Sequence, residues 1–181
     1  QFVDSPWELR EFRTDITTGS VTLIPDTNKG NPVTALYDAN SAFSGANPTL
    51  RQNFLAEISA QMDSLLAPEI NGLTAPEEIL TSFEPAFGEA FSGFTSQSQG
   101  SLDNPSVQAT QDVRSLISAE INARLGNTIP ASSTVNEDQI LNRIGAMTCG
   151  GCHQFSGGAE ITDSVDWPFL GPVGAFVHVR D

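Results

Sequence analysis

Both cysteines of this 181-residue chain lie in one short stretch, and a histidine follows the second of them directly. The stretch reads CGGCH, from Cys149 through Cys152 to His153. Two thiols three positions apart can bond to neighbouring groups on one edge of a flat molecule, pair as a redox-active disulfide, or bind a metal as thiolates. The adjacent imidazole adds a ligand for iron or zinc. This stretch is therefore the candidate site of the chain.

The spacing of the thiols favours covalent attachment of haem c. Each thiol adds to one of two neighbouring vinyl groups on the porphyrin edge, and cysteines placed like Cys149 and Cys152 reach both. The next residue then lies over the iron, so we predict that His153 is the proximal iron ligand. Gly150 and Gly151 have no side chain to obstruct a close approach of the backbone to the ring. We expect one haem c per chain.

Three other interpretations of the motif stay open. A thioredoxin-like redox pair usually opens a helix after a strand, whereas this motif follows a predicted helix. A zinc site would need Cys149, Cys152, His153 and His178, but the adjacent Cys152 and His153 are awkward ligands for one tetrahedral ion. A plain Cys149–Cys152 disulfide would close so short a loop that it would stabilise the fold little.

The residues 149–153 match the haem-binding motif of c-type cytochromes, and the chain resembles that family in these five positions. The resemblance implies an electron carrier. The motif follows 148 residues and precedes only 28, whereas in the commonest small cytochromes c it lies near the N-terminus. Its place at the end of a helical array is more similar to the four-helix-bundle cytochromes of the c-prime type, although their tail is much shorter.

The second axial position of the iron has few candidates. His178 is the other histidine, and it lies between Val177 and Val179, so we predict that it is the distal ligand. Met62 is the alternative ligand, although a methionine in a helix stripe more often fills a core. Met147 lies beside the anchored edge of the ring and is poorly placed. An open or solvent-bound iron is the remaining alternative.

The residues after the motif are apolar and rich in turns. The stretch 164–179 reads SVDWPFLGPVGAFVHV, in which prolines and glycines prevent a helix. We predict a lid folded over the haem, with a tail packed on the protein's own helices as the alternative. Glu160, Asp163 and Asp166 resemble calcium ligands, but their spacing lacks the glycine-centred loop of such sites, so a solvated acidic loop is favoured.

The strongly negative net charge limits the classes of partner that the chain can bind. The chain has a formal net charge of −14 and a pI near 4.2, which excludes nucleic acid and anionic lipid surfaces as favourable partners. A redox protein with a basic patch fits better, and self-association is left open.

No apolar run reaches the roughly 20 residues of a membrane span. The chain starts at Gln1 without a methionine, from which we expect a mature or excised chain whose leader is absent. Because haem c is attached outside the cytoplasm in bacteria, we expect the protein in the periplasm or outside the cell.

The elements that must position the motif are predicted to be helices. An apolar stripe after Asn47 and Pro48 predicts a helix that ends at Pro68. A second helix should open at Thr74 through a capping box and break at Pro85. The third should run from 104 to 125, with Gly126 near its C-terminus, and the fourth from 136 to 147, with a cap at its first residue.

The predicted fold is mainly α, a single domain over 1–181. It has a small β-rich segment at 1–46, a core of three to four amphipathic helices at 47–148, and the motif with its turn-rich tail at 149–181. Strands are expected within 7–16, 20–26 and 31–38.

The predicted function is that of a soluble monohaem cytochrome with two histidine ligands, an electron carrier rather than an enzyme. A haem enzyme or gas sensor with an open distal face is one alternative. A haem-free secreted interaction domain with a Cys149–Cys152 disulfide is the other.

Overall fold

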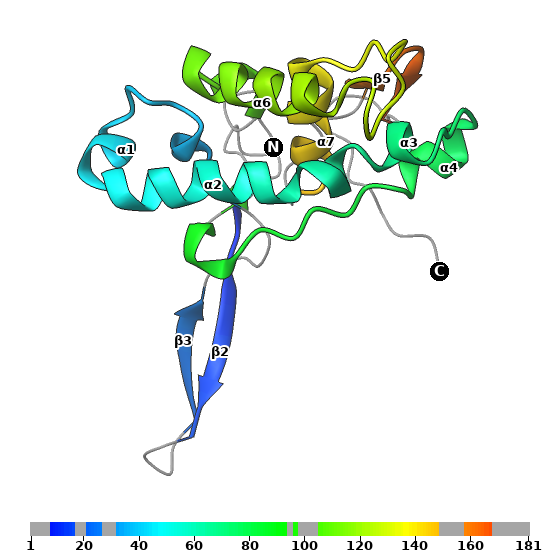
Figure 1. Cartoon of the computed structure of the whole chain (residues 1–181). Coiled ribbons are helices and arrows are strands. Elements are labelled where there is room, and N and C mark those ends of the chain that lie inside the picture. Colours follow the sequence, from blue (N-terminus) through cyan, green and yellow to red (C-terminus); the bar gives the residue numbers. More distant parts are fainter. Residues whose placement is uncertain are drawn as a thin grey trace, which may run out of the picture.

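The structure is a computed structural model that describes residues 8–16, 21–26, 32–93, 96–97, 105–148 and 158–167. This part is mainly helical, as predicted, with short two-stranded sheets (Figure 1). The α-helices are α1 (Ala42–Ala46), α2 (Pro48–Leu65), α3 (Ala67–Ile70), α4 (Pro76–Leu80), α5 (Pro105–Gln108), α6 (Gln111–Arg124) and α7 (Glu137–Ala146). The 3-10 helices are η1 (Thr34–Leu36) and η2 (Glu89–Phe91). The strands are β1 (Glu8–Leu9), β2 (Glu11–Asp15), β3 (Thr22–Asp26), β4 (Ser96–Gln97), β5 (Glu160–Thr162) and β6 (Val165–Asp166).

The main core lies where α2 and α6 run side by side and α7 packs against both (Figure 1). Apolar residues recur every three or four positions along α2, and this spacing turns one stripe of the helix inward. The fully buried residues of that stripe are Phe54, Ile58, Met62 and Leu65. The helix predicted after Pro48 is confirmed, but it ends at Leu65 rather than at Pro68, which lies within α3. None of the described helices is long and apolar enough to cross a membrane.

The helix before the motif is also confirmed, together with its start signal. The Asn136 side chain accepts a hydrogen bond from the Gln139 backbone at 3.0 Å, and the Gln139 side chain accepts one from the Asn136 backbone at 3.1 Å. This capping box satisfies two N–H groups that have no partner within the helix. The C-terminal signal of α6 holds as well, because Gly126 follows the last turn with a φ of +76°.

The predicted second helix is shorter than expected and starts differently. Its N-cap is Ala75 rather than Thr74, and no side chain caps it. Pro76 disfavours helical backbone at the residue before it, so Ala75 is extended and the helix begins at the proline. The helix ends at Leu80, well before Pro85. The predicted capping box at Thr74 is therefore wrong.

The predicted third helix is interrupted between α5 and α6. Thr110 is extended there, and its backbone N–H donates to the Tyr37 carbonyl at 3.0 Å. The Thr110 hydroxyl donates to the same carbonyl at 3.1 Å and accepts from the Ala39 backbone at 2.9 Å. These bonds to a distant turn replace the helical bonds that a continuous helix would form.

The strand predicted within 31–38 is wrong. Adjacent Leu36 and Tyr37 are both buried, which a strand with one solvent face does not allow because its side chains alternate. The 3-10 helix η1 turns both residues into the core. The helical part also starts earlier than predicted, at Ala42.

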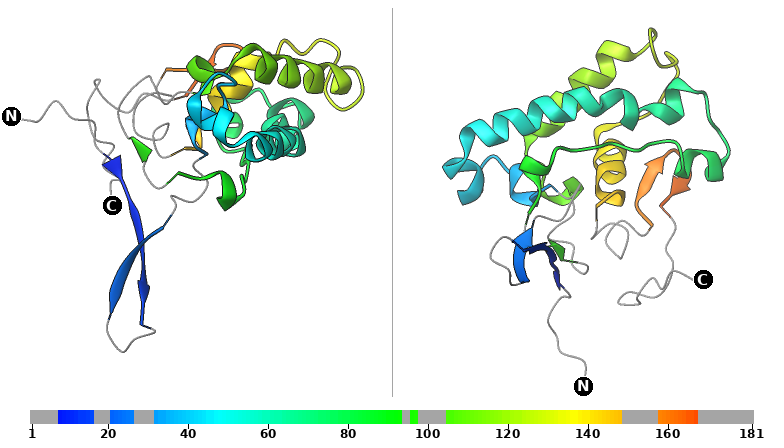
Figure 2. Two further views of the ribbon diagram at one scale, coloured as in Figure 1. Left: turned by 90° about the vertical axis from the view of Figure 1, so that its left-hand side faces the viewer. Right: turned by 90° about the horizontal axis from the view of Figure 1, so that it is seen from below.

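The N-terminal strands form a hairpin that stands away from the helices. β2 and β3 pair antiparallel from Glu11↔Asp26 to Asp15↔Thr22, and β1 pairs with β4. Figures 1 and 2 show the β2–β3 hairpin projecting from the helical part. The strand predictions within 7–16 and 20–26 are confirmed.

Tyr37, the only tyrosine of the chain, has a fully buried hydroxyl with no hydrogen-bond partner among the described residues. An unpaired buried hydroxyl costs stability, so we expect Tyr37→Phe to raise the free energy of unfolding by about 1 kcal/mol in urea titrations. Burial also raises the pKa of Tyr37. The folded state therefore disfavours the phenolate, and stability present below pH ~10 is lost above it.

The two proteins should consequently diverge in alkali. By pH 11 the wild type should lose about 1.4 kcal/mol more than Tyr37→Phe, since only its unfolded state ionises a tyrosine. The prediction is wrong if the unfolding free energies of the two proteins change in parallel with pH, or if Tyr37→Phe is less stable than the wild type. Either result would show that the hydroxyl has a partner.

Candidate functional site

The motif residues Cys149, Cys152 and His153 lie outside the described residues, and so does His178. The structure describes the chain up to Thr148 and again from residue 158. The candidate site is accordingly defined by its flanks, which are α7 before the motif and the β5–β6 hairpin after it.

The helix before the motif is held on its apolar face. Ile140, Leu141 and Ile144 of α7 are buried in the main core. The helix ends at Ala146, and the Thr148 hydroxyl donates to a carbonyl of the last turn at 2.7 Å. The motif thus begins directly after a packed helix end, as predicted.

The segment after the motif forms a small hairpin that the prediction of an irregular tail missed. β5 and β6 pair antiparallel, and two backbone bonds extend the pairing. Gly158 N–H donates to the Trp167 carbonyl at 2.7 Å, and Trp167 N–H donates to the Ala159 carbonyl at 2.8 Å. The Asn142 side chain of α7 donates to the Glu160 carbonyl at 2.8 Å. The hairpin is therefore attached to the helix that precedes the motif.

Arg143 of α7 joins both flanks to the rest of the helices. Its side chain is fully buried and donates to the Ile161 carbonyl of β5 at 2.7 Å and to the Leu65 carbonyl of α2 at 2.6 Å. Two further bonds, of 2.8 and 2.6 Å, go to the two carboxylate oxygens of Glu69 in α3. The guanidinium also lies over the Phe83 ring, 5.9 Å from its centroid. Sequence analysis missed this residue, although its spacing after Ile140 places it within the apolar stripe.

A second apolar cluster surrounds this junction. It combines the end of α7 with the hairpin and with residues around α4, and its buried members are Ile79, Phe83, Ala146, Ile161 and Val165. Trp167 packs on its edge, with its ring centroid 6.1 Å from that of Phe83. The residues that flank the segment 149–157 on both sides therefore pack in one apolar cluster.

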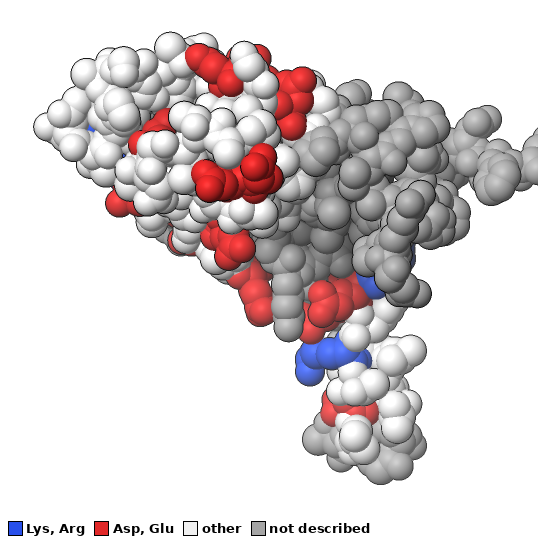
Figure 3. All heavy atoms as spheres, turned by 90° about the vertical axis from the view of Figure 1, so that its right-hand side faces the viewer, with Lys and Arg blue, Asp and Glu red and all other residues white. Residues whose placement is uncertain are grey.

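Two acidic side chains of the hairpin, Glu160 and Asp163, accept hydrogen bonds. The Gln139 amide donates to Glu160 at 2.9 Å and to Asp163 at 3.0 Å. Bonds from the Thr134 hydroxyl and from Gln139 lower the pKa of Asp163. The described residues contain no group of three or more carboxylate, thiol or imidazole side chains that could hold a metal ion. Figure 3 shows further acidic side chains spread over this side of the helical part.

The alternative distal ligand Met62 is fully buried in the main core, on α2. Its neighbours along the stripe are Ile58 and Leu65, which is the environment of a core-filling methionine. Met147, just after α7, is partly exposed. The ligand role of Met62 stays a prediction.

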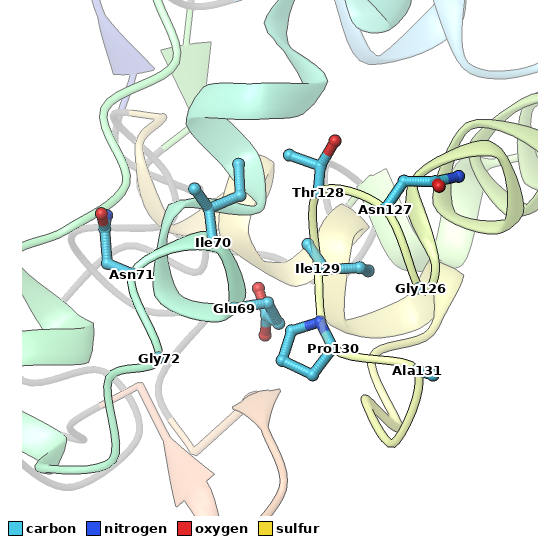
Figure 4. Close-up of a pocket in the computed structure, with 10 residues that line it drawn as sticks. All are labelled: Glu69, Ile70, Asn71, Gly72, Gly126, Asn127, Thr128, Ile129, Pro130 and Ala131. Atoms are coloured by element: carbon cyan, nitrogen blue, oxygen red, sulfur yellow. The ribbon is translucent and has the colours of Figure 1, made fainter.

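A shallow hollow of about 470 Å³ lies between the end of α3 and the loop after α6 (Figure 4). Three of its polar side chains form bonds within the fold. Glu69 binds Arg143, Asn71 donates to the Ala67 carbonyl, and Asn127 donates to the Ala123 carbonyl. The hollow offers no constellation for chemistry.

Comparison of the chain with protein-family models, curated proteins and solved structures gives no match.

Removing the Arg143 side chain should destabilise the protein strongly. Arg143→Met leaves the Glu69 carboxylate without its buried counter-charge, and we expect a loss of about 3–5 kcal/mol in urea unfolding. Adding Glu69→Leu should restore much of it, because no charge then stays buried.

The control for this loss is Arg124→Met. Arg124 forms ion pairs with Asp63 and Glu120 near the surface, so about 1 kcal/mol or less is expected. If Arg143→Met loses no more stability than Arg124→Met, the inference that Arg143 holds α7 to its neighbours is wrong.

Proposed function

We propose that this protein is a c-type cytochrome that holds one haem c covalently and transfers electrons. The observation that carries the proposal is the motif itself, two thiols and an imidazole in the order and spacing of Cys149, Cys152 and His153. The chemistry of this donor set fits the haem on both counts, since thiols form thioethers with vinyl groups and imidazole ligates iron.

The flanks of the motif support the proposal. Arg143 and the second apolar cluster fix the chain before and after the segment 149–157. Trp167, which is partly buried, brings apolar surface near one end of this segment, and a porphyrin face needs such surroundings. A fixed, largely apolar frame suits a cofactor attached by two covalent bonds.

The roles of the individual residues follow from their chemistry. Each thiol would add across one vinyl double bond, with the sulfur bonding to one carbon and the thiol hydrogen ending on the other. His153 would hold the iron through a ring nitrogen, and His178 would be the second ligand. When bound, haem c supplies an iron that accepts and releases one electron. A basic redox partner is part of the proposal, since the chain carries a net charge of −14. A periplasmic or extracellular location completes it, because haem c is attached outside the cytoplasm in bacteria.

The covalent link is tested by Cys149→Ala/Cys152→Ala. The wild-type chain should stain for haem after denaturing electrophoresis, and the double variant should not, because only thioethers survive denaturation. Either single variant is the matched control and should keep one thioether.

Intact mass separates this proposal from the disulfide alternative. An added haem supports the proposal, whereas a chain lighter by two hydrogens and free of haem stain overturns it. Stain retained by the double variant would also contradict the assignment.

The distal ligand is tested by His178→Ala. Loss of the second imidazole should turn a low-spin absorption spectrum high-spin and let carbon monoxide bind the reduced protein. Met62→Leu is the control, and it should keep the spectrum and cost less than about 1.5 kcal/mol of stability. An unchanged low-spin spectrum in His178→Ala, with a change in Met62→Leu, would transfer the assignment to Met62.

A further inference from the structure

The β2–β3 hairpin presents an apolar face that no described residue covers. Pairing of Phe12 with Pro25 and of Thr14 with Leu23 places these four side chains on one side, and all four are exposed. The same alternation brings Ile16 and Val21 to that side just beyond the last pair. The large apolar members are Phe12, Ile16, Val21 and Leu23, which are 50%, 67%, 69% and 67% exposed.

This clustering is unusual within the described part of the chain. Seven large apolar side chains are exposed there, and four of them share this one face. A two-stranded hairpin is only marginally stable in water without a third strand or a packed face. The helices do not supply that packing, because the hairpin projects from them (Figure 2). A contiguous apolar patch in such a place marks an interaction surface.

The opposite face of the hairpin is acidic. It carries Glu11, Asp15 and Asp26 against the single guanidinium of Arg13, which lies 4.0 Å from Asp26. Glu11 and Asp26 are direct cross-strand neighbours, and like charges in such a pair destabilise a sheet. Because a two-stranded ribbon is thin, cations placed around its edges would reach these carboxylates.

The size of the patch and the charge of the chain indicate which molecule covers the patch: a second copy, a lipid surface or a basic protein. Its exposed side chains offer on the order of 500 Å² per chain, below the ~800 Å² per partner of a standard interface. Two copies joined by this face alone would also bring two net charges of −14 together. Anionic lipid is repelled by the same charge. A basic partner is attracted by the negative charge of the chain, and it can add contact area beyond the hairpin.

We propose that the β2–β3 hairpin is a docking element for a partner protein that offers an apolar groove rimmed by Lys and Arg. The apolar face of the hairpin packs into the groove, and the rim cations pair with the carboxylates of the other face. The proposal does not depend on the haem, because no motif residue belongs to this surface.

The probe is a labelled peptide of about ten residues that alternates Val and Lys, followed by fluorescence anisotropy. A Val-Glu peptide keeps the apolar face and reverses the charge, and a Ser-Lys peptide keeps the charge and removes the apolar face. The Val-Lys peptide should bind about tenfold more tightly than either, and its affinity should fall as salt rises.

The hairpin is tested by Val21→Thr/Leu23→Thr, which places β-branched residues suited to strands at both positions. Affinity for the Val-Lys peptide should fall about tenfold, while the haem stain stays unchanged. The matched control is Val107→Thr, because Val107 is 61% exposed on α5 and lies outside the patch. It should bind like the wild type.

Four outcomes would overturn the proposal. The first is that the Val-Lys peptide shows no detectable binding, and the second is that the hairpin variant binds it as well as the wild type does. A dimer in sedimentation that the hairpin variant loses would assign the face to a second copy. Hairpin-dependent flotation with phosphatidylcholine vesicles would assign it to lipid.

Discussion

A guanidinium cut off from solvent needs partners for its donors inside the protein, since a buried charge without them costs several kcal/mol. Arg143 meets this constraint with the carbonyls of Leu65 and Ile161 and the carboxylate of Glu69. These partners belong to α2, β5 and α3, so one side chain sets how three elements meet α7. A shift of α7 along its axis would break all of these bonds together.

The Arg143 junction gives the proposed haem site a simple physical basis. The thiols would hold the ring by covalent bonds, so the fold has to place the ends of the motif segment rather than enclose the ring on its own. The second apolar cluster and the hydrogen bonds of the β5–β6 hairpin do so on both sides of the segment 149–157. In this proposal the long helical part before the motif supports the residues on both sides of the segment 149–157.

The surroundings of α7 and the β2–β3 hairpin differ in how they place apolar and acidic side chains. Around α7, apolar side chains are buried and acidic ones are engaged by Gln139 and Arg143. In the β2–β3 hairpin the apolar side chains are exposed, and the acidic ones lie on the opposite side of the same thin ribbon. A chain with a net charge of −14 tolerates such a patch better than a neutral one, because repulsion between copies opposes aggregation.

Sequence alone determined the features that depend on neighbours within about one helical turn. The capping box of Asn136 and Gln139, the stripe of α2 and the thiol spacing of the motif are of this kind. Only the tertiary structure decided the features whose partners are distant in sequence. Thr110 interrupts a helical pattern because its N–H bonds to Tyr37, and Arg143 is buried because a carboxylate 74 residues away faces it. A hydrophobic pattern shows which residues seek burial, but the partner of a buried polar group is set by how the elements pack.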